Sequence, residues 1–536
     1  MENSEKPRII NLLSKVKSDG SNLTMKAWCL TGFYRSKRAL DTSKVSFGIR
    51  DNKELFSSSF LFRKGIPLPG GFRLNHYKAE IPVRDVLDCD VQNKIIVFSE
   101  KGQGSLYYSF GAAKKGTGQG KRSEVFFHDD ICYFLRQTRK NTVYLTVREK
   151  ELFDLPEGVK LIDEAYSEAE SLGSSGNILM YEKHCSRYEE SASVLFEKLI
   201  DLGYENVFYI LDRKAAEGLD LPEKYRSHIL WKNSPEHIRE FFRCSTFIGT
   251  ETVGHALQLR ASDQRIIMKV QDPDIRHIFL QHGVMYMVSL DSEMRAEFRS
   301  IDRKLYRTVV SSRKEADHFV ELGGFDREDL YVTGLAKFDK SYKNPGADRI
   351  AVMLTWRRWE MNSASVDFTE TTYYRFLERI LAAIPEEYMD KVMILPHPLM
   401  KKYIAGTHLS DYTTLSDASY DELLRDCDLL ITDYSSIAYD AFYRGSKVIF
   451  CWEELDECME RYGGAHLMLD EQSAFGDVCY DVFGKADDGL GGLVRKNYLA
   501  GQTEDNISKY RKIVEFSDGK NTDRIVECLK KDGIIE

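Results

Sequence analysis

The feature that most constrains the fold is the alternation of short apolar runs with helical segments after residue 172. The apolar runs fall into two series, at residues 207–211, 246–248, 277–280, 308–310 and 330–332, and then at 351–354, 392–395, 429–431 and 448–450. Runs of this length separated by segments of about 10–15 residues with helical periodicity predict parallel sheets wrapped by helices. So long a stretch predicts two such lobes, with a boundary near residues 340–348.

The chain before residue 172 has a different pattern. Short alternating runs at residues 45–49, 61–62, 95–98, 106–108 and 143–147 are separated by Gly, Asp, Asn and Lys. Many short strands with polar turns predict a β-rich, sandwich-like domain. The segment 116–121 (GTGQGK) is interpreted as a hairpin tip, because a phosphate loop would need a preceding strand and a following helix.

We therefore expect an α/β chain with three parts. Residues 1–172 would form the β-rich accessory domain, 173–345 an N-terminal lobe and 346–536 a C-terminal lobe. The polar, Gly-rich segment 171–177 is the predicted linker between the first two parts. A chain of 536 residues is too long for one hydrophobic core, which agrees with this division.

Composition excludes some classes of protein. Hydrophobic residues make up 43% and charged residues 30%, as in an ordinary globular enzyme, and the net charge of −9 argues against a general nucleic-acid binder. The ten cysteines are scattered, which favours a reduced compartment. The sequence has no apolar segment of signal-peptide or membrane-spanning length. We expect a cytoplasmic protein whose membrane association is peripheral.

Two histidines follow apolar runs directly. Ligands of open parallel sheets bind outside the carboxyl ends of strands, so polar residues there carry more weight than elsewhere. His282, followed by Gly283, suits a general base near neutral pH, and the glycine would let a ligand approach. His397 is bracketed by two prolines that fix its backbone, which suits a residue presented to a phosphate. Either one, taken alone, could also be a structural histidine.

A third strand end is more specific. The apolar run 429–431 leads into Thr432 and Asp433, and Ser435 and Ser436 then open a predicted helix that ends at Gly445. A helix N-terminus and two hydroxyls can hold phosphates. Asp440, one turn into the helix, could reach a ribose hydroxyl. The alternative is simple capping of a structural helix.

Weaker candidates follow other strands. Arg357 could pair with a diphosphate, and Lys337 lies near the crossing between the lobes. Acceptor contacts and helix capping explain Glu251 and His255 equally well. We expect a metal-independent site without a cofactor, in which the helix dipole, a histidine and basic residues meet the charge of the leaving group.

His-Gly at 282–283, His-Pro at 397–398 and Thr-Asp-Tyr-Ser-Ser at 432–436, with Asp440 four residues later, together resemble the CDP-glycerol glycerophosphotransferase family. That family includes teichoic acid polymerases and CDP-ribitol enzymes. The likeness covers roughly residues 175–520, and the segments 181–188 and 355–357 also resemble family landmarks.

This resemblance implies a GT-B-like pair of Rossmann-type lobes with the acceptor on the N-terminal lobe and the CDP-polyol on the C-terminal lobe. It implies transfer of a polyol phosphate, glycerol or ribitol phosphate, to a hydroxyl of a lipid-linked polyol-phosphate or glycan acceptor, with release of CMP. His282 and His397 would be the catalytic residues: His282 would deprotonate the acceptor, and His397 would bind or neutralise the diphosphate. The remaining candidates would bind the CDP donor: Gly283, Lys337, Arg357, Thr432, Asp433, Ser435, Ser436 and Asp440.

Two segments depart from the family pattern. Members commonly have Thr-Pro-Leu-Lys after His-Gly, whereas this chain has Val-Met-Tyr-Met at 284–287, so a lysine expected near the acceptor is missing. The usual Gly-x-Pro-Arg-x-Asp appears as Gly-Leu-Ala-Lys-Phe-Asp at 334–339. The resemblance places the enzyme on the anionic inner face of the cell membrane. Two alternatives stay open: a glycosyltransferase that uses a nucleotide sugar, and a polymer-binding protein without activity.

Overall fold

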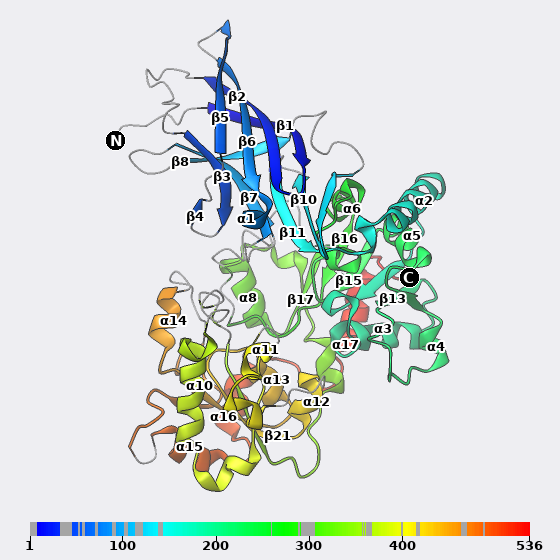
Figure 1. Cartoon of the computed structure of the whole chain (residues 1–536). Coiled ribbons are helices and arrows are strands. Elements are labelled where there is room, and N and C mark those ends of the chain that lie inside the picture. Colours follow the sequence, from blue (N-terminus) through cyan, green and yellow to red (C-terminus); the bar gives the residue numbers. More distant parts are fainter. Residues whose placement is uncertain are drawn as a thin grey trace. The chain divides into compact units, whose positions relative to one another are not determined.

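The computed structural model describes most of the chain (Figure 1). It leaves out residues 1–7, 33–44, 52–53, 56–58, 70–72, 88–92, 101–105, 113–121, 138–142, 259, 288–289, 291–305, 356, 358–359, 361–366, 398–399, 414–418, 462–468 and 486–487. The predicted hairpin tip at 116–121 and Pro398 lie outside the described residues. The described residues group into two units: unit 1 holds residues 1–175, 233–243 and 257–275, and unit 2 holds 176–232, 244–256 and 276–536.

Unit 1 is built on an 11-stranded sheet in the order β5-β6-β2-β1-β8-β7-β11-β10-β9, with β3 pairing β7 and β4. Its pairs are antiparallel except for β1 with β8. The strands are β1 (Arg8–Ser18), β2 (Asn22–Gly32), β3 (Val45–Asp51), β4 (Glu54–Leu55), β5 (Ser59–Pro67), β6 (Arg73–Pro82), β7 (Asn93–Glu100), β8 (Leu106–Ala112), β9 (Val125–His128), β10 (Ile131–Gln137) and β11 (Val143–Glu149). The prediction of a β-rich N-terminal region is confirmed.

The helices of unit 1 are α1 (Val83–Leu87), η3 (Leu152–Asp154), α2 (Pro156–Leu172), α5 (Pro235–Arg243) and α6 (Gln264–Val270). The sequence analysis did not identify α2, which begins at a proline in its first turn. Asp154 in η3 forms a buried ion pair with Arg148 of β11, with 2.6 Å between Oδ2 and Nη1. This pair joins the last strand of the sheet to the start of the helical part. The three-domain division drawn from the sequence stays a prediction.

The first sheet of unit 2 has seven parallel strands in the order β14-β13-β12-β15-β16-β17-β18. They are β12 (Ile178–Tyr181), β13 (Val207–Leu211), β14 (Ile229–Trp231), β15 (Thr246–Gly249), β16 (Arg276–Phe279), β17 (Arg307–Val310) and β18 (Leu330–Val332). The strand order reverses between β12 and β15, and ligands of such sheets bind outside the carboxyl ends of the strands at that point. The sequence analysis missed the short strands β12 and β14.

The second sheet of unit 2 has five parallel strands in the order β20-β19-β21-β22-β23, and its order reverses between β19 and β21. The strands are β19 (Arg349–Met353), β20 (Val392–Ile394), β21 (Cys427–Thr432), β22 (Lys447–Cys451) and β23 (Asp477–Cys479). Every residue of β21 and β22 is buried, as expected for central strands covered on both faces.

Helices and 3₁₀ turns connect the strands of unit 2. Those around the first sheet are η4 (Lys183–Cys185), α3 (Ser191–Asp201), α4 (Glu223–Arg226), η5 (Val253–Ala256), α8 (Arg313–Glu321), η7 (Arg327–Asp329) and η8 (Ala336–Lys340). Those that follow are η10 (Phe368–Glu370), α10 (Thr372–Ala383), η11 (Glu386–Lys391), α11 (Lys401–Ile404), η12 (His408–Tyr412), α12 (Tyr420–Arg425), α13 (Ile437–Tyr443), α14 (Leu455–Arg461), α15 (Leu490–Asn497), α16 (Glu504–Arg511) and α17 (Asn521–Lys531).

The last helix of the chain returns to the first sheet of unit 2. Figure 1 shows α17 next to α3, and Lys198 of α3 pairs with Asp523 of α17 at 2.5 Å. The apolar residues Ile525 and Leu529 of α17 are fully buried in a core that also includes residues of both sheets. The fold class is thus two parallel Rossmann-like sheets with an antiparallel β region before them, as expected. Among the described residues, no helix combines the length and apolar character needed to cross a bilayer.

Candidate functional site

Three adjacent strands of the first sheet deliver polar residues to one edge. β12, β15 and β16 pair in parallel, so their carboxyl ends lie side by side. Tyr181 at the end of β12 is opposite Gly249 at the end of β15. A Cβ on Gly249 would lie 2.6 Å from Cζ of Tyr181, so this close approach requires glycine. The ends of β12 and β15, where the strand order reverses, are therefore tightly packed, and the polar residues follow directly after them.

His282 follows β16 and lies between two carboxylates. The preceding residue, Gln281, has a left-handed backbone (φ 61°) and is fully buried, with its side-chain amide donating to the Val309 carbonyl at 2.6 Å. This anchored turn leaves the half-exposed imidazole of His282 with Nδ1 at 3.4 Å from Glu190 Oε2 and Nε2 at 3.8 Å from Glu251 Oε1. The arrangement can hold the ring in one orientation and stabilise a positive charge on it.

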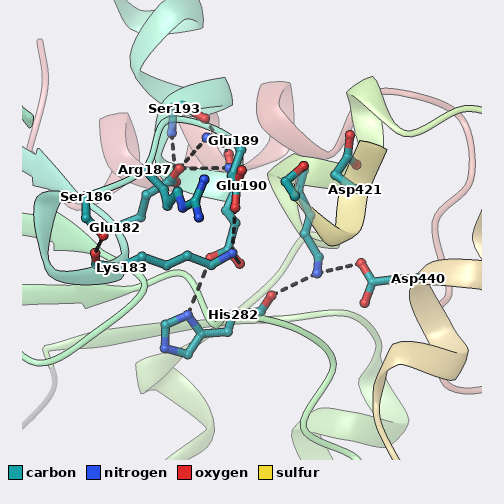
Figure 2. A network of polar contacts seen from close by, with 12 residues as sticks. Glu182, Lys183, Ser186, Arg187, Glu189, Glu190, Ser193, His282, Asp421 and Asp440 are labelled. Atoms are coloured by element: carbon teal, nitrogen blue, oxygen red, sulfur yellow. Dashed lines mark hydrogen bonds and ion pairs between the residues drawn. The ribbon is translucent and has the colours of Figure 1, made fainter. Parts of the chain in front are cut away.

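The carboxylate beside His282 belongs to a wider polar network (Figure 2). Lys183 donates to Glu189 at 2.7 Å and pairs with Glu190 at 2.9 Å. The fully buried Glu182 accepts hydrogen bonds from the backbone N–H groups of Glu190 at 2.9 Å and Ser193 at 3.4 Å, at the start of α3. Glu182 therefore anchors the segment that carries Glu190.

The two neighbouring carboxyl groups have opposite pKa shifts. Burial raises the pKa of Glu182 to about 8, and the charge of Glu190 adds to that rise. Burial also disfavours the charge on Glu190, but the hydrogen bond from His282 and the charge of Lys183 outweigh it and lower the pKa of Glu190 to about 2. Glu190 is thus the ionised member beside the imidazole.

A second group of side chains converges on Gly283. A Cβ built on Gly283 would meet Asp440 Oδ2, Lys337 Nζ and Ser436 Oγ, each at 3.7 Å. Lys337 Nζ donates to the His282 carbonyl at 2.8 Å and pairs with Asp440 at 2.6 Å. Lys337 comes from η8 after β18, whereas Ser436 is the N-cap residue of α13 and Asp440 lies in its first turn, after β21 of the second sheet. Five residues expected from separate strand ends, His282, Gly283, Lys337, Ser436 and Asp440, are therefore brought together.

Arg357 and Asp433 face each other in the interior. Arg357 Nη1 lies 2.9 Å from Asp433 Oδ2, and both side chains are 1% exposed. Asp433 also accepts from the backbone N–H of Thr355 at 3.0 Å, and Arg357 donates to Glu454 at 3.1 Å. Burial opposes the charge of Arg357, but that of Asp433 outweighs it and raises the pKa of the guanidinium. Both residues therefore hold the loops after β19 and β21 in place.

Thr432 and the two serines lie at the end of β21. The Thr432 hydroxyl is buried and donates to the Met353 carbonyl at 2.6 Å, which ties β21 to β19. Ser435 and Ser436 are half-buried, and Ser435 Oγ accepts from the N–H of Ile437 at 3.5 Å. Ser436 is the N-cap residue of α13, but its side chain forms no capping hydrogen bond. Its hydroxyl faces the group around Gly283.

His397 follows β20 in the second sheet. Its backbone carbonyl accepts from Met400 N–H at 2.7 Å, which turns the chain after the strand. The side chain is half-buried, and burial lowers the pKa of His397 to about 4. The imidazole is therefore neutral at pH 7 in the absence of a ligand.

Glu182, Lys183 and Glu190 were not among the predicted site residues. All three follow β12. The segment 181–188, which resembles a family landmark, contains Glu182 and Lys183, and Glu190 lies two residues beyond it. The available signal was the density of charged residues directly after a buried tetrapeptide, Ile178–Tyr181. Because the sequence pattern did not reveal β12, these residues did not stand out as residues that follow a strand end.

Comparisons with known proteins identify the family and the fold. Residues 172–531 match the family described as CDP-Glycerol:Poly(glycerophosphate) glycerophosphotransferase. The minor teichoic acid biosynthesis protein GgaB of Bacillus subtilis (strain 168) is 24% identical over 373 residues, which is 64% of this chain and 38% of that protein. The teichoic acid glycerol-phosphate primase of the same organism is 28% identical over 187 residues, covering 32% of this chain and 46% of the primase.

A solved structure shares the fold. A variant of the wall teichoic acid polymerase TagF soaked with CDPG matches with a TM-score of 0.50 and 16% identity, over 70% of this chain and 94% of that one. The two parallel sheets described above are therefore GT-B-like. The chain spans less than half the length of the two curated relatives.

Proposed function

Because this chain belongs to the CDP-glycerol:poly(glycerophosphate) glycerophosphotransferase family, we propose that it transfers a polyol phosphate from a CDP-polyol to a hydroxyl group. The acceptor would be a growing teichoic-acid-like or capsular polymer, and CMP would be released. Glycerol phosphate is the first choice of transferred group, since the family description names it and TagF, which shares the fold, was soaked with CDPG.

One observation carries this proposal: Lys337, Ser436 and Asp440 meet at Gly283, next to His282. A cation, a hydroxyl and a carboxylate around a residue without a side chain suit a phosphate and a polyol or ribose hydroxyl. The glycine lets a ligand approach the backbone between them. The neighbouring imidazole supplies the base that hydroxyl transfer requires.

The proposed step is an in-line displacement at phosphorus. His282 Nε2 removes the proton from the acceptor hydroxyl while its oxygen attacks the phosphorus that carries the polyol. The bond from that phosphorus to the oxygen of CMP breaks, and CMP leaves with the electron pair. Glu190 stabilises the imidazolium through Nδ1, and the imidazolium later returns the proton to water.

The remaining candidates would bind the CDP donor. Lys337 and the hydroxyls of Ser435 and Ser436 would meet the diphosphate charge, and Asp440 would accept from a ribose hydroxyl. His397 is neutral at rest because of burial, so it would bind the diphosphate as a hydrogen-bond donor or take up a proton with it. The donor-binding residues would be positioned by Thr432, Asp433 and Arg357, which hold the chain at the ends of β19 and β21. A metal-independent reaction stays a prediction.

A CDP-donor screen tests the proposal. The protein is incubated with CDP-glycerol, CDP-ribitol and UDP-glucose in separate reactions, each with a lipid-linked polyol-phosphate acceptor, and released nucleotides are separated chromatographically. We expect CMP from a CDP-polyol and extension of the acceptor. The His282→Ala variant is the control for background hydrolysis.

Two other outcomes would replace the proposal. Release of UDP with extension of the acceptor would identify a glycosyltransferase. Binding of the polymer without consumption of any nucleotide would identify a polymer-binding protein. Association with an anionic membrane surface, expected from the lipid-linked acceptor, would be checked by co-sedimentation with phosphatidylglycerol vesicles.

A further inference from the structure

A cluster of histidines and a carboxylate lies where the strand order of the first sheet reverses. His184 lies in η4 after β12, and Glu251 and His255 lie after β15, with His255 in η5. One ligand atom from each of the three residues can be chosen so that all lie within 4.8 Å of one another. This is the arrangement found where two imidazoles and a carboxylate share one cation. The function proposed above assigns no role to His184 or His255.

Glu251 is the centre of the cluster. Its Oε2 lies 2.6 Å from Nδ1 of His255, and its Oε1 lies 3.7 Å from Nε2 of His184. The carboxylate is mostly buried, with 11% of its side chain exposed.

The backbone aims both imidazoles at the same place. Lys183, His184 and Cys185 all have left-handed backbones, with φ of 43°, 57° and 63°. The turn is held because His184 N–H donates to Glu251 at 2.7 Å and Lys232 donates to the His184 carbonyl at 2.7 Å. As a result the rings of His184 and His255 stack with centroids 3.9 Å apart.

Neighbouring groups limit the donor set to nitrogen and oxygen. The buried Cys185 thiol points to the His255 carbonyl oxygen, 3.4 Å from Sγ. His282 Nε2 is 3.8 Å from Glu251 Oε1, so a third imidazole nitrogen lies close to the carboxylate. Two or three imidazoles with one carboxylate suit Zn²⁺, Co²⁺ or Ni²⁺, whereas Mg²⁺ and Ca²⁺ prefer sites made of oxygen atoms only.

We propose that His184, Glu251 and His255 form a binding site for a divalent transition metal of the zinc class. The metal clamps the turn after β12 to the turn after β15. This site is separate from the proposed diphosphate site. Lys337 of the diphosphate site contacts the backbone carbonyl of His282, whereas Glu251 of the metal site lies near the imidazole of His282. It does not depend on the transferase activity, and its test uses none.

The test measures metal binding directly. The protein is stripped with EDTA, dialysed and titrated with ZnCl₂ by calorimetry and with CoCl₂ by visible absorption, with MgCl₂ as the reference cation. We expect one Zn²⁺ or Co²⁺ per chain and a Co²⁺ spectrum without a thiolate charge-transfer band. Zn²⁺ should raise the thermal midpoint because it binds only the folded chain. Mg²⁺ should leave it unchanged.

Two variants and a matched control assign the site. His184→Asn keeps a residue that tolerates left-handed backbone, and His255→Gln removes the second imidazole. Each should weaken Zn²⁺ binding at least tenfold. His408→Gln is the control: its Nε2 lies 3.6 Å from Glu378 and its side chain is 61% exposed, against 3.7 Å and 63% for His184. Among the residues that the structure describes, His408 and Glu378 belong to no group of three potential metal ligands.

Three results would overturn the proposal. They are the absence of stoichiometric Zn²⁺ binding, wild-type affinity in both cluster variants, and an equal loss of affinity in His408→Gln, which would mean scattered surface histidines. Circular dichroism of the metal-free proteins shows whether each variant folds. If His184→Asn does not fold, His255→Gln decides.

Discussion

At the scale of single residues, the imidazole of His282 and the carboxylate of Glu190 have separable roles. His282→Ala should lower kcat by about 10²–10⁴-fold, the range for loss of a general base, while the affinity for CDP-glycerol changes little. Glu190→Gln should lower kcat less, because the base remains and only its orientation and charge partner are lost. Single-turnover kinetics measures the rate of the chemical step, and calorimetry measures the affinity for CDP-glycerol.

Glu189→Gln is the matched control for the carboxylate, since Glu189 also contacts Lys183, at 2.7 Å. It should keep kcat near that of the wild type. An unchanged kcat in His282→Ala would remove the assignment of the base. Equal losses in Glu189→Gln and Glu190→Gln would mean that the charge of the segment, and not the contact with His282, matters.

Gly283 provides a test of the space in which the phosphate is proposed to bind. In Gly283→Ala the new methyl group would meet three polar side-chain atoms at 3.7 Å, an ordinary contact, so the fold should be kept. The methyl group would occupy the approach to Lys337 and Ser436, and we expect binding of CDP-glycerol to weaken about tenfold or more, about 1.4 kcal/mol. Calorimetric titration measures the affinity for CDP-glycerol, and thermal unfolding shows whether the fold is kept.

Gly249→Ala is the contrasting variant. Its Cβ would lie 2.6 Å from the Tyr181 ring, so it should destabilise the fold. A wild-type affinity for CDP-glycerol in folded Gly283→Ala would place the phosphate elsewhere.

His397 makes stability depend on pH. Burial lowers its pKa to about 4 in the folded protein, against about 6.5 in the unfolded chain. Between these two pKa values the unfolded chain binds more protons than the folded chain. The contribution of the neutral His397 to the free energy of unfolding is therefore complete above pH 6.5 and is lost as the pH falls toward 4. His397→Gln should therefore lose about 1–2 kcal/mol less stability than the wild type between pH 7 and pH 4.5, after allowance for the partly exposed ring.

Urea unfolding of both proteins at each pH measures this difference. Parallel losses of stability in the wild type and His397→Gln would show that the imidazole is not held neutral. The same comparison with CDP-glycerol present would reveal a proton taken up with the diphosphate.

At the scale of elements, the loops after β19 and β21 depend on the buried pair Arg357–Asp433. Arg357→Ala would leave a buried carboxylate without its cation, which typically costs about 3–5 kcal/mol. The exposed pair Arg461–Glu457 within α14, at 3.2 Å, is the control, and Arg461→Ala should cost less than about 0.5 kcal/mol. Urea unfolding compares the two, and similar losses would contradict a structural role for Arg357.

At the scale of the whole chain, the last helix is capped by a residue far earlier in the sequence. α17 has no side-chain cap of its own, and Asp339 of η8 accepts from the N–H groups of Asn521 at 3.0 Å and Thr522 at 2.7 Å. Asp339→Ala should lower the free energy of unfolding by about 1–2 kcal/mol, the usual cost of a lost cap. Because Asp339 follows Lys337 by two residues, affinity for CDP-glycerol should fall too.

Asp518→Ala tests whether any acidic residue near α17 has this effect. Asp518 is exposed and contacts Arg524 of the same helix. It should change stability by less than about 0.5 kcal/mol. Unfolding measurements that rank the two variants in the opposite order would remove the capping role of Asp339.

The long apolar runs determined most of the fold in advance. Runs such as 429–431 and 448–450 are central strands in the structure, because residues buried on both faces of a parallel sheet must be apolar. The short strands β12, β14 and β23 and the helix α2 were missed. β12 and β14 are no less apolar than the short runs that did predict strands, β23 contains only two apolar residues, and α2 directly follows the strand-rich pattern.

The sequence by itself determined where strands end, and so it placed His282, Lys337, Ser436 and Asp440 at strand ends or helix starts. Only the tertiary structure decided which of these side chains meet. It brings Glu190 to His282 across 92 positions, and it turns Arg357 and Asp433 toward each other in the interior. The physical reason is that apolar period and turn residues act locally, whereas contacts between charged side chains depend on the order and register of strands far apart in the chain.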